Sequence, residues 1–294
     1  MSSTAGSPRI EIRNVLVPID FSDSSRSALD HAVAIGGWYR SRITALHVAL
    51  PMYYPDGPIP SGATGGSPQD GSLELLRRFV EPATASGVAI DTVGIEGAAA
   101  PVILERALEL PADLVIMGTH GRGGFDRWVL GSVAEKVLRK APCPLLTVSR
   151  PAQSVQPRSL FQKILFACDF SASSMKALDY ALSLAREADA SLTLLHVLEW
   201  LPSDDERRRS LAEEAFTRLR DAVPASVREW LETDAVVTEG RAYREILRIA
   251  QERAVELIVM GVQGRGALDV MFFGSTAHHV VRQSACPVLT VRAS

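Results

Sequence analysis

The feature that most constrains this chain is an internal repeat. Segment 15–25, which reads VLVPIDFSDSS, returns as 164–174, which reads ILFACDFSASS, so that Asp20 is matched by Asp169 at an offset of 149 residues. Further along each copy, a glycine motif and a Cys-Pro pair recur at an offset of 143 residues. Self-similarity on this scale predicts one arrangement of strands and helices built twice.

The repeat divides the chain of 294 residues into two parts of ordinary domain size. We expect one domain at 1–152 and a second at 160–294, with a boundary near Gln156. Segment 149–159 between them contains two prolines and several polar residues, which is typical of a linker.

The difference between the two offsets places one change of length inside the repeat. In the first copy, segment 51–72 is rich in proline, glycine and serine, which predicts a long surface loop. In the second copy, the charged segment 204–221 predicts a helix instead.

Composition indicates a folded protein of the cytoplasm. Hydrophobic residues make up 47% and charged residues 22% of the chain, as in globular proteins. The net charge of -3 gives no general attraction to nucleic acid or to an anionic membrane, so we expect neither as a partner. The polar start of the chain is unlike a secretory signal, and no segment has the apolar length of a membrane span. The three cysteines form no close pair, which favours small buried side chains in a reducing compartment.

Apolar strands and helical patterns alternate along each copy. In the first copy we expect strands at 15–19, 43–48, 89–95, 114–117 and 145–148, and helices at 25–35, 73–86, 101–110 and 132–140. This alternation predicts an α/β fold made of two tandem, doubly wound, mostly parallel five-stranded domains of the Rossmann-like kind. In such sheets, ligands bind beyond the carboxyl ends of the strands, where the strand order reverses.

A spaced glycine motif follows the fourth strand of each copy. It reads Gly118-x-x-Gly121, nine residues, then Gly131-Ser132 in the first copy, and Gly261-x-x-Gly264, nine residues, then Gly274-Ser275 in the second. Glycines let backbone N–H groups approach phosphate oxygens, and a helix N-terminus offers further donors and a favourable dipole. The alternative is a simple turn followed by a capping box of Ser132 and Glu135, which needs no ligand. The identical spacing in both copies, with an aspartate ending the first strand of each, favours the phosphate site.

This duplicated constellation resembles the universal stress protein family, whose ATP-binding members carry G-x2-G-x9-G-(S/T) after the fourth strand. The resemblance covers both halves nearly end to end, including the Asp-Phe-Ser after the first strand and the Cys-Pro before the last. It implies two universal stress protein domains that bind ATP, with Mg²⁺ as the accompanying ion.

The resemblance also implies which residues hold the nucleotide. Asp20 and Asp169 would lie near the adenosine, and the backbones of Val48 and Val197 would bond the adenine edge. Met117 and Met260 would flank the nucleoside. The phosphates would be held by Gly118, Gly121, Gly131, Ser132 and Val133 in the first copy, and by Gly261, Gly264, Gly274, Ser275 and Thr276 in the second. Arg122 and Arg265 follow the second glycine, where an arginine either clamps phosphate or is a solvated loop residue.

The two copies differ close to this motif. The first copy has Glu135 on the first turn of the helix, where a carboxylate would repel phosphate, whereas the second has His278, whose imidazolium would attract it. The second copy has the less typical loop, with Val262-Gln263 in place of Thr119-His120. The relative affinities of the two sites stay open.

Three classes of function fit these features. The leading one is a nucleotide-responsive stress regulator that acts through an unidentified protein partner. The second is a weak ATP hydrolase or phosphoryl-transfer protein, in which Asp20 and Asp169 would hold a metal ion with the phosphates. The chain has no Gly-Lys pair and therefore no P-loop lysine, so we assign no catalytic residue. The third is a nucleotide-free scaffold. A dinucleotide oxidoreductase is disfavoured because no G-x-G-x-x-G follows the first strand.

The short closing strands carry a further expectation. Segments 144–149 and 287–292 are apolar and would invite pairing at a sheet edge. The resemblance suggests that they meet across a pseudo-twofold axis, so that one chain forms an internal pseudo-dimer, with further homodimer formation left open.

Overall fold

The computed structural model describes residues 10–50, 68–119, 130–149, 160–200, 202–262 and 274–293. The first copy consists of β1 (Asn14–Pro18), α1 (Asp23–Tyr39), β2 (Arg42–Ala49), α2 (Pro68–Thr84), β3 (Ile90–Glu96), α3 (Ala99–Glu109), β4 (Leu114–Gly118), α4 (Ser132–Lys140) and β5 (Leu145–Val148). The second consists of β6 (Lys163–Cys168), α5 (Ala172–Ala188), β7 (Ser191–Leu198), α6 (Asp205–Asp221), α7 (Ala225–Arg228), β8 (Thr233–Glu239), α8 (Ala242–Glu252), β9 (Leu257–Val262), α9 (Ser275–Gln283) and β10 (Val288–Arg292).

The predicted alternation of strands and helices is confirmed in both copies. Helix α2 begins at Pro68, so the loop expected over 51–72 ends earlier than we predicted. Residues 51–67 of that loop, and residues 150–159 of the expected linker, lie outside the described part of the chain. The charged segment of the second copy forms α6, as its composition predicted.

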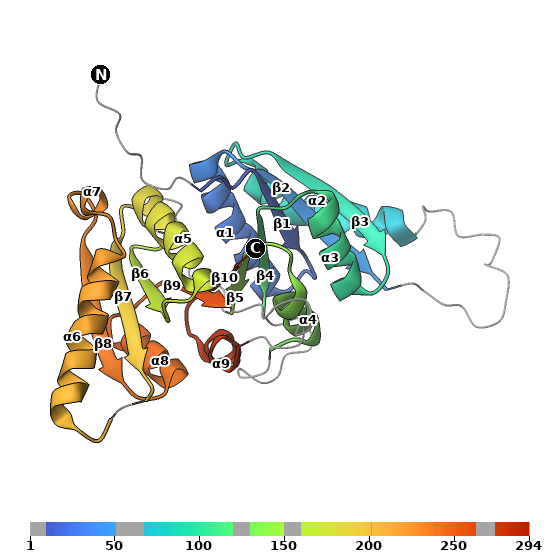
Figure 1. The fold of residues 1–294 in the computed structure, drawn as a ribbon. Coiled ribbons are helices and arrows are strands. Elements are labelled where there is room, and N and C mark those ends of the chain that lie inside the picture. Colours follow the sequence, from blue (N-terminus) through green and yellow to red (C-terminus); the bar gives the residue numbers. More distant parts are fainter. Residues whose placement is uncertain are drawn as a thin grey trace, which may run out of the picture.

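The ten strands of the described part of the chain join one sheet in the order β3-β2-β1-β4-β5-β10-β9-β6-β7-β8 (Figure 1). Neighbouring strands within each copy are parallel, and the two copies meet where β5 and β10 pair antiparallel, with Leu146 opposite Leu289. The prediction that the closing strands meet is therefore confirmed. Pairing with each other removes the exposed edge that each strand would otherwise present.

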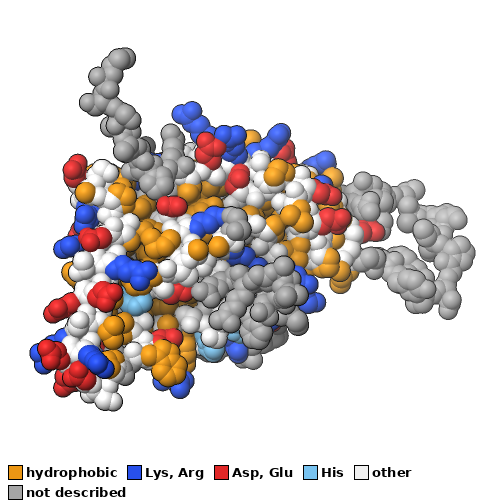
Figure 2. Space-filling model, viewed as in Figure 1, with side chains coloured by type: hydrophobic (Ala, Val, Ile, Leu, Met, Phe, Trp, Pro, Cys, Tyr) orange, Lys and Arg blue, Asp and Glu red, His pale blue; other side chains and the backbone are white. Residues whose placement is uncertain are grey.

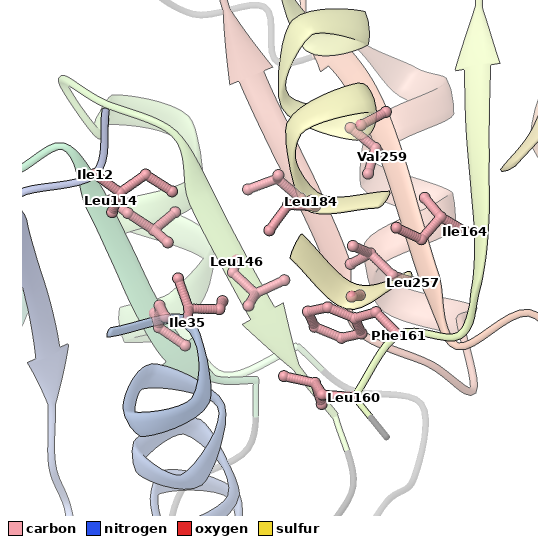
Figure 3. Packing of buried hydrophobic residues seen from close by; sticks show 14 of the residues in the cluster. Ile12, Ile35, Leu114, Leu146, Leu160, Phe161, Ile164, Leu184, Leu257 and Val259 are labelled. Carbon is pink, nitrogen blue, oxygen red and sulfur yellow. The ribbon is translucent and has the colours of Figure 1, made fainter. Parts of the chain in front are cut away.

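Two hydrophobic clusters fill the two faces of the sheet, and each runs through both copies. One cluster lies beneath α1, α2, α5 and α6, and the other beneath α3, α4, α8 and α9. In the first, Leu146 of β5 lies between Ile35 of α1 and Leu184 of α5, close to Phe161 (Figure 3). Burial of each such side chain contributes about 1.5 to 3 kcal/mol. The two halves therefore share their core rather than each burying its own.

A polar contact also ties the copies together. The hydroxyl of Tyr39 at the end of α1 lies 2.8 Å from Oγ of Ser183 in α5, and burial raises the pKa of this tyrosine. Basic and acidic side chains are interspersed on the face of the molecule shown in Figure 2, in keeping with the small net charge. Over the described ranges, none of the helices is long and apolar enough to cross a membrane.

Candidate functional site

The strand order reverses beside the first strand of each copy. The chain runs outward from β1 to β3 and then returns to β4 on the other side of β1, and β6 to β9 repeat this path. The carboxyl ends of β1 and β4, and of β6 and β9, therefore border the place where ligands bind in open parallel sheets.

An aspartate stands at this place in both copies, in the same local structure. Oδ1 of Asp169 accepts hydrogen bonds from the Ser171 backbone N–H at 2.9 Å and from its hydroxyl at 2.5 Å, and Asp20 makes the same two bonds with Ser22. Burial disfavours the charge on Asp169, but these hydrogen bonds outweigh it and hold the pKa of that carboxyl below its usual value. Each aspartate is thus an oriented anion at the end of the first strand.

The residue after each aspartate adopts an unusual backbone. Phe21 has φ of 65° and Phe170 has φ of 59°, a left-handed conformation that disfavours side chains larger than glycine. The turn lets the next serine cap a helix, since Oγ of Ser171 accepts the Ser174 N–H at 3.2 Å. Strain of this kind persists where the surroundings impose it, and it clusters at functional sites.

A histidine bonds to the end of the first strand in each copy. The carbonyl of Cys168 accepts a hydrogen bond from Nδ1 of His196 at 2.8 Å, and the carbonyl of Ile19 accepts one from His47 at 2.7 Å. In copy one the pairing of the two strands ends at Pro18 and Leu46, so His47 takes the acceptor that would extend the ladder to Val48, whereas in copy two the ladder continues to the pair of Cys168 and His196. Each histidine thus lies beside the expected adenine contact.

The peptide groups of the two valines consequently face the end of the first strand. In a parallel ladder, alternate residues bond to opposite neighbours. The carbonyl of Leu198 accepts from Gly240, at the end of β8, so Val197 points its peptide groups the other way, with its N–H toward the Cys168 carbonyl and its C=O past the end of β6. A carbonyl in this position can accept a hydrogen bond from the edge of a planar base.

Gly118 and Gly261 have a packing role that we did not predict. A Cβ on Gly261 would lie 2.3 Å from the Ser174 nitrogen, and one on Gly118 would lie 2.7 Å from Cβ of Ser24. These glycines let the first turns of α1 and α5 pack directly on β4 and β9. The packing of the helix by itself requires a glycine at both positions, and their phosphate role stays a prediction.

Gly131 and Gly274 are the N-caps of α4 and α9, and as glycines they give neither helix a side-chain cap. The capping box considered for Ser132 and Glu135 is therefore wrong, and Glu135 pairs with Arg139 at 2.9 Å instead. Gly131 has φ of -59° and Gly274 has φ of -54°, so neither adopts a positive φ. Among the described residues, an added Cβ on Gly274 would meet no atom within 4 Å, whereas one on Gly131 would lie 3.1 Å from the Thr119 carbonyl oxygen.

In the second copy these features border one cleft of about 240 Å³. It is lined by seven of the predicted residues, namely Asp169, Val197, Met260, Gly261, Gly274, Ser275 and Thr276. The structure thus brings together residues from the ends of β6, β7 and β9 and from the start of α9.

The first copy has the same arrangement of elements. Asp20, Val48, Met117, Gly118, Gly131, Ser132 and Val133 occupy positions equivalent to those around the cleft of the second copy. The remaining predicted residues, Gly121, Arg122, Gly264 and Arg265, lie outside the described residues.

The sequence did not reveal two polar residues of the cleft. Cys168 lines it, and burial raises the pKa of its thiol. Glu199 also lines it, and its Oε1 accepts the backbone N–H of Ala242 at 2.8 Å, at the first residue of α8. Copy one has Ile19 and Leu50 at the equivalent positions, and this difference between the copies is the sequence signal that could have pointed to Cys168 and Glu199.

The expected attraction of phosphate to an imidazolium at His278 gains no support. Burial lowers the pKa of His278, although the nearby charge of Glu135 opposes that shift, so the neutral ring is favoured.

Comparisons with known proteins agree with this architecture. The model of the universal stress protein family matches residues 11–149 and again residues 160–292. The universal stress protein YxiE of Bacillus subtilis (strain 168) is 35% identical over 148 residues, covering 45% of this chain and 100% of the relative. A universal stress protein of Mycobacterium tuberculosis is 25% identical over 292 residues, covering 95% of this chain and 96% of the relative. The crystal structure of a universal stress protein from Archaeoglobus fulgidus matches with a TM-score of 0.70 at 23% identity, covering 97% of this chain and 100% of that one.

Proposed function

This chain belongs to the universal stress protein family as a tandem two-domain member, and from that premise we propose that each copy binds ATP as a regulatory ligand. The nucleotide acts as a signal that a protein partner in the cytoplasm reads. One observation carries the proposal: the cleft of the second copy, where an oriented aspartate, an outward-facing peptide group and an uncapped helix start converge.

Each part of the cleft suits one part of ATP. The Val197 C=O suits the adenine edge, because it points past the end of β6 and can accept a hydrogen bond from the base. The start of α9 suits the phosphates, since its first N–H groups have no side-chain cap and the helix dipole favours negative charge. The open space around Gly274 leaves room for a phosphate oxygen against the backbone.

Mg²⁺ would be held mainly by the phosphates. Among the residues that the structure describes, no group of three or more His, Cys, Asp or Glu side chains could hold a metal ion alone. Magnesium keeps several waters and takes one or two carboxylates plus phosphate oxygens, and ionised Asp169 is the carboxylate that lines the cleft nearest the strand ends.

The acids of the cleft support a binding role over hydrolysis. Asp169 accepts hydrogen bonds from Ser171, and Glu199 accepts one from the first N–H of α8. A general base must instead reach the water that attacks the terminal phosphate and be able to take its proton.

The test is the number of nucleotides that the full chain binds. Gently purified protein should release adenine nucleotide on denaturation, and calorimetry with ATP and Mg²⁺ should give two sites per chain. The Gly131→Ala and Gly274→Ala double variant, shown to be folded by circular dichroism, should bind none. Normal binding by that variant would place the phosphates elsewhere, and no binding by the wild type would favour the scaffold.

A further inference from the structure

Each copy anchors the site helix of the other copy. Nη2 of Arg292, the last residue of β10 in copy two, donates a hydrogen bond to the carbonyl of Leu138 at 2.9 Å and another to the carbonyl of Arg139. Both carbonyls belong to the last turn of α4, in copy one. Arg292 therefore caps the carboxyl end of the helix whose other end starts the first phosphate site.

The reverse contact is present but weaker. Ser149, which follows β5 in copy one, donates its hydroxyl hydrogen bond to the carbonyl of Ser284 at 3.2 Å. Ser284 is the C-cap of α9, the site helix of copy two. Ser149 and Arg292 occupy equivalent positions of the repeat, so the contact is present in both copies. Its strength differs, because Arg292 donates two hydrogen bonds from a charged group to α4, whereas Ser149 donates one from a neutral group to the end of α9.

A short helix depends on such an anchor. Helix α4 has 9 residues, and helices of this length are marginal by themselves. The last carbonyls of a helix have no partner within it, and a cation there both satisfies them and interacts favourably with the dipole. Because helix order is cooperative, a firmer last turn keeps the N–H groups of the first turn aligned.

The backbone of Arg292 also borders the second site. It pairs in register with Val262 of β9, and Val262 lines the cleft of copy two. A continuous path of contacts therefore joins the two sites. It runs from the cleft of copy two through the end of β10 to the guanidinium of Arg292, and from there along α4 to the N-terminus of that helix.

We propose that Arg292 is a positioning residue through which copy two organises the nucleotide site of copy one, with no equally strong contact in the opposite direction among the described residues. This inference rests on the proposed function for its ligand. It predicts that a substitution in copy two weakens binding in copy one.

The experiment measures each site alone in the full chain. With Gly274→Ala, only copy one binds; with Gly131→Ala, only copy two does. In the first background, Arg292→Ser should weaken ATP binding by about three- to tenfold, and Arg292→Lys should restore much of it. In the second background, Arg292→Ser should change the affinity by less than about twofold, because α9 lacks that anchor. Arg228→Ser, at an exposed arginine of α7, removes the same charge away from α4 and should alter neither site.

Hydrogen exchange separates this inference from the proposed function, because it needs no ligand. Arg292→Ser should raise amide exchange in α4 and leave α9 unchanged. Unchanged exchange in α4, or an equal loss of affinity in both copies, overturns the inference. Faster exchange in α4 in a protein that binds no ATP refutes the proposed function and the assignment of Arg292 to a nucleotide site, and leaves only a helix anchor.

Discussion

Nδ1 of His196 donates its hydrogen bond at 2.8 Å to the carbonyl of Cys168, the residue with which the pairing of β6 and β7 ends. The phenyl ring of Phe170 lies against the same imidazole, with ring centroids 4.6 Å apart. The left-handed turn at Phe170 and the end of the ladder are thus parts of one structure, which lies beside Asp169 and the cleft.

Replacement of this histidine should reduce nucleotide binding in its own copy. In the Gly131→Ala background, His196→Ala removes the hydrogen bond to the Cys168 carbonyl and the ring that packs on Phe170, next to Asp169. We expect ATP affinity to fall by about three- to tenfold, the effect of one hydrogen bond, as measured by calorimetry. The matched control is His47→Ala, which lies in the inactivated copy and should leave that affinity unchanged; a loss with both variants would contradict a local role.

Alanine substitutions at Gly261 and at Gly274 should lower the free energy of unfolding by different amounts. Gly261→Ala forces a Cβ to 2.3 Å from the Ser174 nitrogen, and backbone contacts of this kind cannot yield, so we expect a loss of at least about 2 kcal/mol in the free energy of unfolding. Gly274→Ala adds a Cβ in open space and should cost less than about 1 kcal/mol. Urea denaturation of both variants measures the difference, and equal stabilities would refute the packing role of Gly261.

Asp169 should stabilise the fold only above acidic pH. Its pKa is lowered from 3.8 in the folded state, so its contribution is complete above the unfolded pKa and is lost as the pH falls through the folded value. The stability advantage of the wild type over Asp169→Asn should therefore shrink below about pH 4. Asp179 serves as the opposite control: burial raises its pKa, so Asp179→Asn should be more stable than the wild type at neutral pH.

Cys143 should resist alkylation in the folded protein. Burial, assisted by the charge of Asp113, raises the pKa of its thiol to about 12, so that almost no thiolate exists at pH 8. Because only the thiolate reacts, iodoacetamide labelling should be about a hundred- to a thousandfold slower than in urea at the same pH. Peptide mass mapping over time measures the two rates; equal rates would contradict the burial of this thiol.

The sequence predicted those features that depend on local pattern. The repeat and the alternation of strands and helices indicated the fold, and the family resemblance indicated that the closing strands meet, as they do at Leu146 and Leu289. The features it did not predict depend on contacts between residues distant in the chain. Gly261 is required by the approach of α5, and Glu199 caps a helix whose start could not be located from the sequence. The sequence analysis therefore placed the glycine pattern correctly, but it attributed the whole pattern to phosphate binding and did not recognise that Gly261 also serves the packing of α5.

The junction of β5 with β10 also affects how the two clefts can change. In a symmetric homodimer of one gene product, every substitution enters both sites at once. In a covalent pair, a mutation enters one site alone, and the other retains its properties. Cys168 and Glu199 stand where the first copy has Ile19 and Leu50, so this divergence is already present. Fusion of the two copies therefore permits one molecule to acquire two ligand preferences, or two ranges of ligand concentration, without assembling different subunits.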